Sequence, residues 1–152
     1  MTACLRTLVA SAPLLAIPLA VLLASLGAAL GQAAPPQADA AAVRAVIEAQ
    51  LAAFQRDDGA AAFSYAAPAI QQQFGTAEAF MAMVRQGYHP VYRPRQVIFE
   101  APVLRDGAWV QPLLVTAQDG RVLVALYTME RQPDASWRIG GVLLLASKGQ
   151  GV

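Results

Sequence analysis

The sequence predicts an α+β fold in which three helices come first and four antiparallel strands follow. Between residues 39 and 88, apolar residues recur at the spacing of an amphipathic helix. From residue 96 onward the spacing changes to the alternation typical of strands. Short turn signals separate the predicted strands, and connections of this length join antiparallel neighbours. Helices followed by strands are typical of an α+β fold with the helices packed on one face of the sheet.

Each predicted helix has an apolar stripe and recognisable ends. The first runs from Asp39, its expected N-cap, to a stop at residues 57–59, and its stripe includes Val43, Ile47 and Phe54. A shorter helix is expected over 60–66. Ile70 and Phe74 then make one further turn before Gly75. The third helix follows Thr76 as N-cap and ends near Gly87.

The predicted strands cover residues 96–104, 108–117, 121–131 and 136–146, with Asp-Gly or Pro-Asp turn signals between them. They form a meander. Because residues 121–131 are apolar at both even and odd positions, we expect that strand to be central and covered on both faces. The sheet face that the helices do not cover is more apolar than expected for a monomer. This indicates a partner, such as a second copy of the chain.

The N-terminal segment has the pattern of a secretory signal peptide. A short start containing Arg6 precedes an uncharged apolar run from Thr7 to Leu30, and small residues follow before Pro35. We expect residues 1–33 to be cleaved after Ala33, residues 34–38 to form a linker, residues 39–146 to form one domain and residues 147–152 to form a flexible tail. The location would be periplasmic or secreted. The alternative is a retained membrane anchor, because about 20 apolar residues can span a bilayer.

The composition argues against several classes of function. Cys4 is the only cysteine and lies within the expected signal peptide, so the exported domain has no disulfide, thiolate nucleophile or cysteine metal ligand. Without Arg6, 10 basic residues balance 10 acidic ones, and this neutrality argues against a nucleic-acid partner. No Gly-rich phosphate loop or serine nucleophile motif occurs, and we expect no cofactor and no metal.

Several segments together resemble an uncharacterised proteobacterial family, domain of unknown function 4864. They are Val46-Ile47-Glu48-Ala49-Gln50-Leu51-Ala52-Ala53-Phe54, Ala67-Pro68 with Phe74-Gly75, Phe80 with Met83-Val84, and the most specific one, Gly87-Tyr88-His89-Pro90-Val91-Tyr92-Arg93-Pro94. The order of elements and the closing Trp137-Arg138-Ile139-Gly140-Gly141 also resemble the nuclear transport factor 2-like superfamily. That resemblance implies a cone in which the helices and a curved four-stranded sheet enclose a pocket. The superfamily includes isomerases, dehydratases and non-catalytic binding domains, so the resemblance does not predict an activity.

Six residues are candidates for ligand binding: Gln50, Tyr88, His89, Tyr92, Arg93 and Tyr127. Gln50 lies on the apolar stripe of the first helix, where a cone would present its amide to the pocket; alternatively it meets water or backbone. Pro90 and Pro94 are expected to keep His89 and Arg93 extended. The segment from Tyr88 to Arg95 would then form a rigid aromatic and arginine lip able to bind a carboxylate or phosphate. The alternative is a structural crossing with the tyrosines as core anchors and the arginines solvated.

Catalytic residues are harder to find. His89 is the only histidine, and no carboxylate is adjacent in sequence to orient it. Asp57 and Asp58 follow a helix end, where a solvated turn is the ordinary interpretation. We therefore assign no catalytic residue and expect a non-catalytic binding or accessory domain with an apolar pocket for a small apolar or carboxylate-bearing molecule. The second hypothesis is an interaction protein that dimerises or docks through its outer sheet face. The third is an isomerase- or dehydratase-like enzyme.

Overall fold

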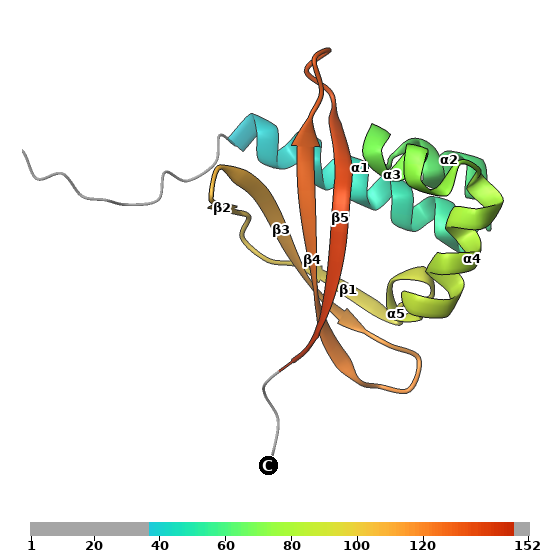
Figure 1. Cartoon of the computed structure of the whole chain (residues 1–152). Helices are drawn as coiled ribbons and strands as arrows, with labels where there is room; N and C mark the ends of the chain where they lie inside the picture. Colours follow the sequence, from blue (N-terminus) through green and yellow to red (C-terminus); the bar gives the residue numbers. More distant parts are fainter. Residues whose placement is uncertain (1–36, 148–152) are drawn as a thin grey trace, which may run out of the picture. The chain divides into compact units, whose positions relative to one another are not determined.

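A computed structural model describes residues 37–147, so the predicted signal peptide and residues 148–152 of the predicted tail lie outside the described residues. The described part contains five helices followed by five strands (Figure 1). They are α1 (Gln37–Gln55), α2 (Gly59–Ser64), α3 (Pro68–Phe74), α4 (Ala77–Gly87), α5 (His89–Tyr92), β1 (Gln96–Phe99), β2 (Val103–Arg105), β3 (Ala108–Thr116), β4 (Val122–Arg131) and β5 (Trp137–Ala146). The helices pack on one face of an open antiparallel sheet. The α+β class is confirmed, whereas the expected numbers of three helices and four strands are wrong.

The sheet has the order β1-β3-β4-β5, and β2 pairs with the same side of β3 beyond the end of β1. β3 and β4 are the interior strands, with Leu113 opposite Ala125. A bulge interrupts the pairing of β4 with β5 next to Thr128. The turn residues expected between strands lie between β2 and β3, β3 and β4, and β4 and β5.

The predicted strand 96–104 is divided because of Pro112 on the neighbouring strand. The N–H of Glu100 donates to the carbonyl of Pro112, at 3.1 Å, so these two residues face each other as a hydrogen-bonded pair. Such a pair normally exchanges two N–H···O bonds. Proline has no N–H to give the second one. The regular ladder therefore stops after Phe99, and the chain pairs again only at Val103.

Local sequence signals explain most helix ends. The side chains of Asp58 and Thr76 accept hydrogen bonds from the N–H groups of Ala61 and Ala79, so they cap α2 and α4. Asp39, the expected cap of α1, lies instead inside its first turn. His89 is helical and not extended, because Pro90 takes an early position of α5 that needs no N–H donor.

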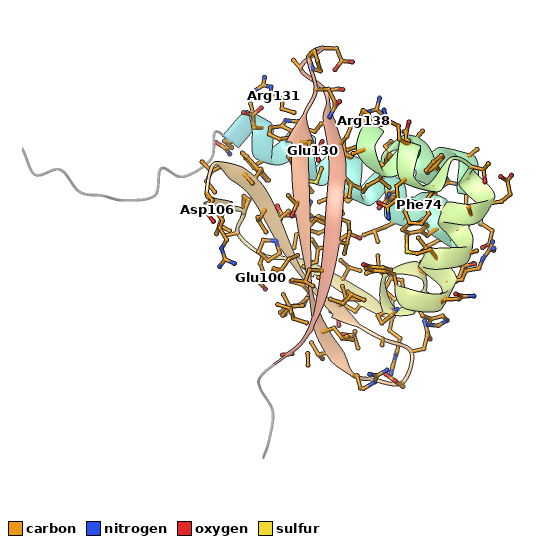
Figure 2. All side chains as sticks on the ribbon, in the orientation of Figure 1. Phe74, Glu100, Asp106, Glu130, Arg131 and Arg138 are labelled. Carbon is orange, nitrogen blue, oxygen red and sulfur yellow. The ribbon has the colours of Figure 1, made fainter. Side chains whose placement is uncertain are left out.

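The core lies between the helices and the inner face of the sheet. Its fully buried side chains include Val43 and Ile47 of α1, Leu113 and Val115 of β3, and Tyr127 of β4. Figure 2 shows Glu130, Arg131 and Arg138 near the turn that joins β4 to β5, at one end of the sheet. These three charged residues therefore lie away from the packed inner face.

The outer face of the sheet is apolar and accessible. Among residues 37–147 no helix covers it, and the side chains of five large residues are 38–56% exposed: Ile98, Val103, Val122, Leu143 and Leu145. The expectation that strand 121–131 is covered on both faces is therefore wrong for its outer face. The register places these residues on the side opposite Leu113 and Tyr127.

Candidate functional site

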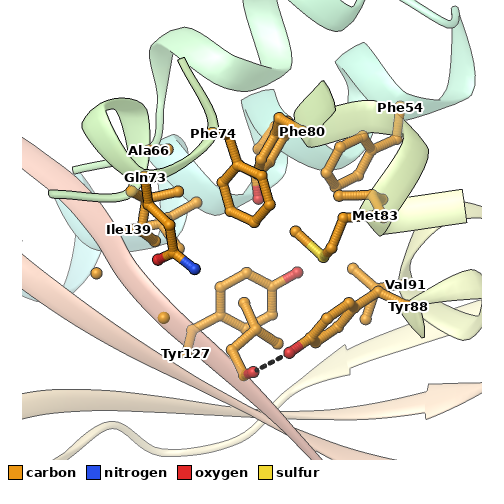
Figure 3. Close-up of a pocket in the computed structure, with 16 residues that line it drawn as sticks. Phe54, Ala66, Gln73, Phe74, Phe80, Met83, Tyr88, Val91, Tyr127 and Ile139 are labelled. Atoms are coloured by element: carbon orange, nitrogen blue, oxygen red, sulfur yellow. Dashed lines mark hydrogen bonds between the residues drawn. The ribbon is translucent and has the colours of Figure 1, made fainter. Parts of the chain in front are cut away.

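A cavity of about 420 Å³ lies between the helices and strands β4 and β5 (Figure 3). This volume falls within the range of about 300–1,000 Å³ that is common for small-molecule sites. Gln73 on its wall is exposed, so the cavity reaches solvent beside α3. The wall is formed by Gln50, Phe54, Ala66, Ile70, Gln73, Phe74, Phe80, Met83, Val84, Tyr88, Val91, Tyr127, Ile139, Gly140, Gly141 and Val142.

The wall is apolar and carries no charge at neutral pH. None of its residues is an acid, a base or a histidine, and only two glutamines and two tyrosines bear polar side-chain atoms. Phe80 connects the aromatic side chains of the wall, with ring centroids 5.8 Å from Phe74 and 6.4 Å from Phe54. A site of this composition favours an uncharged, largely apolar ligand.

Tyr127 places a hydroxyl inside this apolar space. Its position on the inner face of β4 directs the ring from the sheet toward the helices, as Figure 3 shows. The side chain is completely buried, and its oxygen has no hydrogen-bond partner among the described residues. Burial raises the pKa of the Tyr127 phenol well above its usual 10.0, so the group stays a neutral O–H donor.

Two of the other three polar wall residues, Tyr88 and Gln50, already have hydrogen-bond partners, and the third, Gln73, is exposed. The Tyr88 hydroxyl donates to the carbonyl of Val142 at 3.1 Å. The Gln50 amide, on a side chain only 3% exposed, donates from Nε2 to the carbonyl of Ala62 at 3.1 Å. These bonds attach α4 to β5 and α1 to α2. Gln50 and Tyr88 therefore shape the wall through structural contacts.

The predicted lip residues Tyr92 and Arg93 lie outside the cavity wall and meet Asp57. The Tyr92 hydroxyl donates to the Asp57 carboxylate, and Arg93 Nη2 lies 2.8 Å from Asp57 Oδ2. Arg85 Nη2 approaches the same carboxylate at 3.7 Å. The Tyr92 hydrogen bond, with help from the two arginines, holds the pKa of Asp57 below its usual value of 3.8. We call these four residues the Asp57 cluster.

The Asp57 cluster joins the end of α1 to α5. Arg93 Nη1 donates to the carbonyl of Phe54 in the last turn of α1, and the guanidinium lies 3.9 Å above the Tyr92 ring centroid. The Gln55 amide donates to the carbonyl of Tyr92 at 3.1 Å. Arg93 thus gives a second donor to a helix-end carbonyl that also accepts the N–H of Asp57 at 3.1 Å. In this structure the segment serves as a crossing from helix to sheet.

His89 is exposed and does not line the cavity; its ring lies 6.2 Å from the Tyr92 ring centroid. Within residues 37–147, no group of three or more His, Cys, Asp or Glu side chains is placed to hold a metal ion. The same residues contain no helix with the length and apolarity needed to cross a bilayer.

Three of the six predicted ligand-binding residues, Gln50, Tyr88 and Tyr127, thus share one cavity, and the other three do not line it. Ligand binding by any of them stays a prediction. The sequence reasoning did not select Phe74 or Met83, which line the same space. Their helical spacing was visible, but it identifies a buried side of a helix without telling a packed core from a cavity wall.

A comparison with known protein families matches the part of the chain that forms this domain. The family described as Domain of unknown function (DUF4864) matches residues 36–152. The chain belongs to this family. The DUF4864 match spans every described helix and strand, so the cavity and the Asp57 cluster lie within the family's own domain. No curated protein and no solved structure matches the chain.

Proposed function

We propose that this DUF4864 protein is an exported, non-catalytic domain that binds a small, largely apolar molecule in the cavity between the helices and strands β4 and β5. The observation that carries the proposal is an apolar cavity of about 420 Å³ whose wall has no charged side chain. Packing normally fills the space between a sheet and its helices, leaving few voids larger than a water molecule. A cavity of this size is therefore a default candidate for a binding site.

The chemistry of the wall supports binding over catalysis. General acid–base catalysis needs a group that exchanges protons near neutral pH. His89 and Asp57 lie off the wall, and the two wall tyrosines offer only phenols. An isomerase- or dehydratase-like reaction would lack a base at this site.

Two further parts of the proposal concern the location of the protein and its superfamily. The segment 1–33 has the pattern of a cleaved signal peptide, which would place the protein in the periplasm or outside the cell. Five helices followed by an antiparallel sheet, with a cavity between the layers, support placement in the nuclear transport factor 2-like superfamily.

The binding test pairs two matched substitutions and one neutral fluorescent dye, Nile red. Ile70→Trp places a large ring at the cavity wall, whereas Ile98→Trp places the same ring on the exposed outer sheet face. We expect the exported protein to enhance Nile red fluorescence, Ile70→Trp to abolish the enhancement and Ile98→Trp to retain it. Native mass spectrometry of the protein from periplasm should likewise show a retained small molecule that Ile70→Trp loses. Equal dye binding by both variants would refute the cavity assignment.

A second function, association through the outer sheet face, is favoured by the exposed side chains of Ile98, Val103, Val122, Leu143 and Leu145. Contiguous exposed apolar surface of this kind commonly marks an interaction site. The two functions are compatible, because the cavity and the outer face lie on opposite sides of the sheet.

A further inference from the structure

The buried hydroxyl of Tyr127 predicts a polar feature of the ligand that the apolar wall alone does not. A buried hydroxyl without a hydrogen bond loses its interactions with water and gains nothing in return. Native proteins therefore contain few such groups, and each one needs an explanation. The Tyr127 hydroxyl has no partner in residues 37–147 and points into the cavity.

Comparison with the remaining polar groups singles Tyr127 out. The wall hydroxyl of Tyr88 and the wall amide of Gln50 donate to backbone carbonyls of Val142 and Ala62. The amide of Gln73, the remaining polar side chain of the wall, is exposed to solvent. Trp109 Nε1 is also buried without a partner in the described part of the chain, but Trp109 does not line the cavity. Tyr127 is thus the described residue that combines a cavity position with an uncommitted, fully buried donor.

The wall also limits the charge of the ligand. Burying an ionised group is costly unless an opposite charge pairs with it. No Arg, Lys or His lines the cavity, and the guanidinium of Arg93 is held by Asp57 and the carbonyl of Phe54. A carboxylate placed beside Tyr127 would have no cation to neutralise it.

We propose that the ligand is an uncharged molecule with a single oxygen acceptor, such as a ketone or ester carbonyl, on an apolar skeleton, and that this oxygen accepts a hydrogen bond from the Tyr127 hydroxyl. This inference rests on the proposed function of the cavity and names the chemical class that the site selects. Phe74, Phe80 and Met83 contact the skeleton, and Tyr127 sets the position of the oxygen.

Three probes of similar shape test the inference: fluorene, fluorenone, which adds a carbonyl oxygen, and fluorene-9-carboxylate, which adds a charge. Their affinities are measured by displacement of Nile red from the exported protein and from Tyr127→Phe and Tyr88→Phe. Tyr127→Phe removes the uncommitted hydroxyl, whereas Tyr88→Phe removes a wall hydroxyl that already bonds to Val142. Thermal unfolding of all three proteins confirms that they fold.

We expect fluorenone to bind about three- to tenfold more tightly than fluorene, the ratio expected for one net hydrogen bond. Tyr127→Phe should abolish this preference and keep fluorene affinity, and Tyr88→Phe should keep the preference. The carboxylate should bind most weakly. Because the lost hydroxyl had no partner, Tyr127→Phe should leave the melting temperature unchanged or raise it.

The outcomes separate this inference from the proposed function. Fluorene and fluorenone binding equally well to the parent protein, or a preference that survives Tyr127→Phe, would overturn the role of Tyr127 while the cavity remains a binding site. Tightest binding of the carboxylate would overturn the uncharged class. Displacement by none of the three probes from a protein that binds Nile red would overturn the ligand class, and failure to bind Nile red would overturn the proposed function itself.

Discussion

The side-chain amide of Gln111 donates a hydrogen bond to the main-chain carbonyl of Glu100, at 2.7 Å. In a regular ladder between β1 and β3, this Glu100 carbonyl would instead accept the backbone N–H of residue 112. Because that residue is proline, Gln111 supplies the missing donor from the preceding position. This bond explains why an amide side chain only 3% exposed is retained on the inner face of β3.

We predict that Gln111 and Pro112 are energetically coupled. Gln111→Met keeps the side-chain length but removes the donor, and it should lower the free energy of unfolding by about 1–2 kcal/mol. Adding Pro112→Val restores a backbone N–H facing Glu100 and should recover most of that loss. Urea unfolding of the four proteins of this double-mutant cycle gives the coupling. Strictly additive effects of the two substitutions would contradict the replacement of one donor by the other.

The Asp57 cluster predicts a stability change in acid. The folded pKa of Asp57 lies below its usual 3.8, so the unfolded chain takes up the proton first as the pH falls. The stabilisation is therefore complete above about pH 4 and is lost as the pH falls through the lower, folded pKa. In Asp57→Asn, the urea midpoint should depend less steeply on pH below about 4 and should run parallel to the parent near neutrality. Parallel curves over the whole acid range would show that Asp57 has no such linkage.

Two glycines with different surroundings provide a packing prediction. A Cβ at Gly59 would lie 2.8 Å from Cγ of Met81, which is buried, whereas a Cβ at Gly87 meets nothing within 4 Å. Gly59→Ala should lower the free energy of unfolding by roughly 1–2 kcal/mol through overpacking. Gly87→Ala should leave it unchanged or raise it by up to about 1 kcal/mol. Thermal or urea unfolding measures both; equal effects would contradict the close approach of α2 to α4.

The outer sheet face predicts a change in oligomeric state. Leu143 is 56% exposed and lies near Leu145 on the same strand. If copies associate through this face, Leu143→Glu should convert a dimer to a monomer in sedimentation velocity. Its free energy of unfolding as a monomer should change by about 0.5 kcal/mol or less. Gln72→Glu, an exposed change on α3, is the matched control. A parent protein that is monomeric at micromolar concentration would contradict association through this face.

Features that depend on nearby residues were predictable from the sequence. Thr76 caps α4 as expected, and the turn at Asp106 and Gly107 uses two positive φ angles of 51° and 79°. Asp and Gly tolerate that backbone better than other residues. The helix-then-strand order followed from the change in apolar spacing for the same reason.

Features that depend on distant partners were not predictable. The division of strand 96–104 requires knowledge that Pro112 faces Glu100, which no local pattern contains. The role of Arg93 depends on Asp57 and Phe54, more than thirty positions earlier in the chain. Apolar spacing likewise placed Phe74 on the buried side of a helix without indicating that it lines a cavity.

The short helix α3 contributes Ile70, Gln73 and Phe74 to the cavity wall, yet none of its seven residues is fully buried. Gln71 attaches it to the preceding segment through the carbonyls of Phe63 and Ala66. Ile70 and Phe74 nevertheless pack against the core, so α3 forms an outer wall of the cavity. Because the cavity already reaches solvent beside this helix, a guest molecule can enter and leave there while α1 and the sheet stay folded. The stability of the whole domain therefore does not limit its exchange.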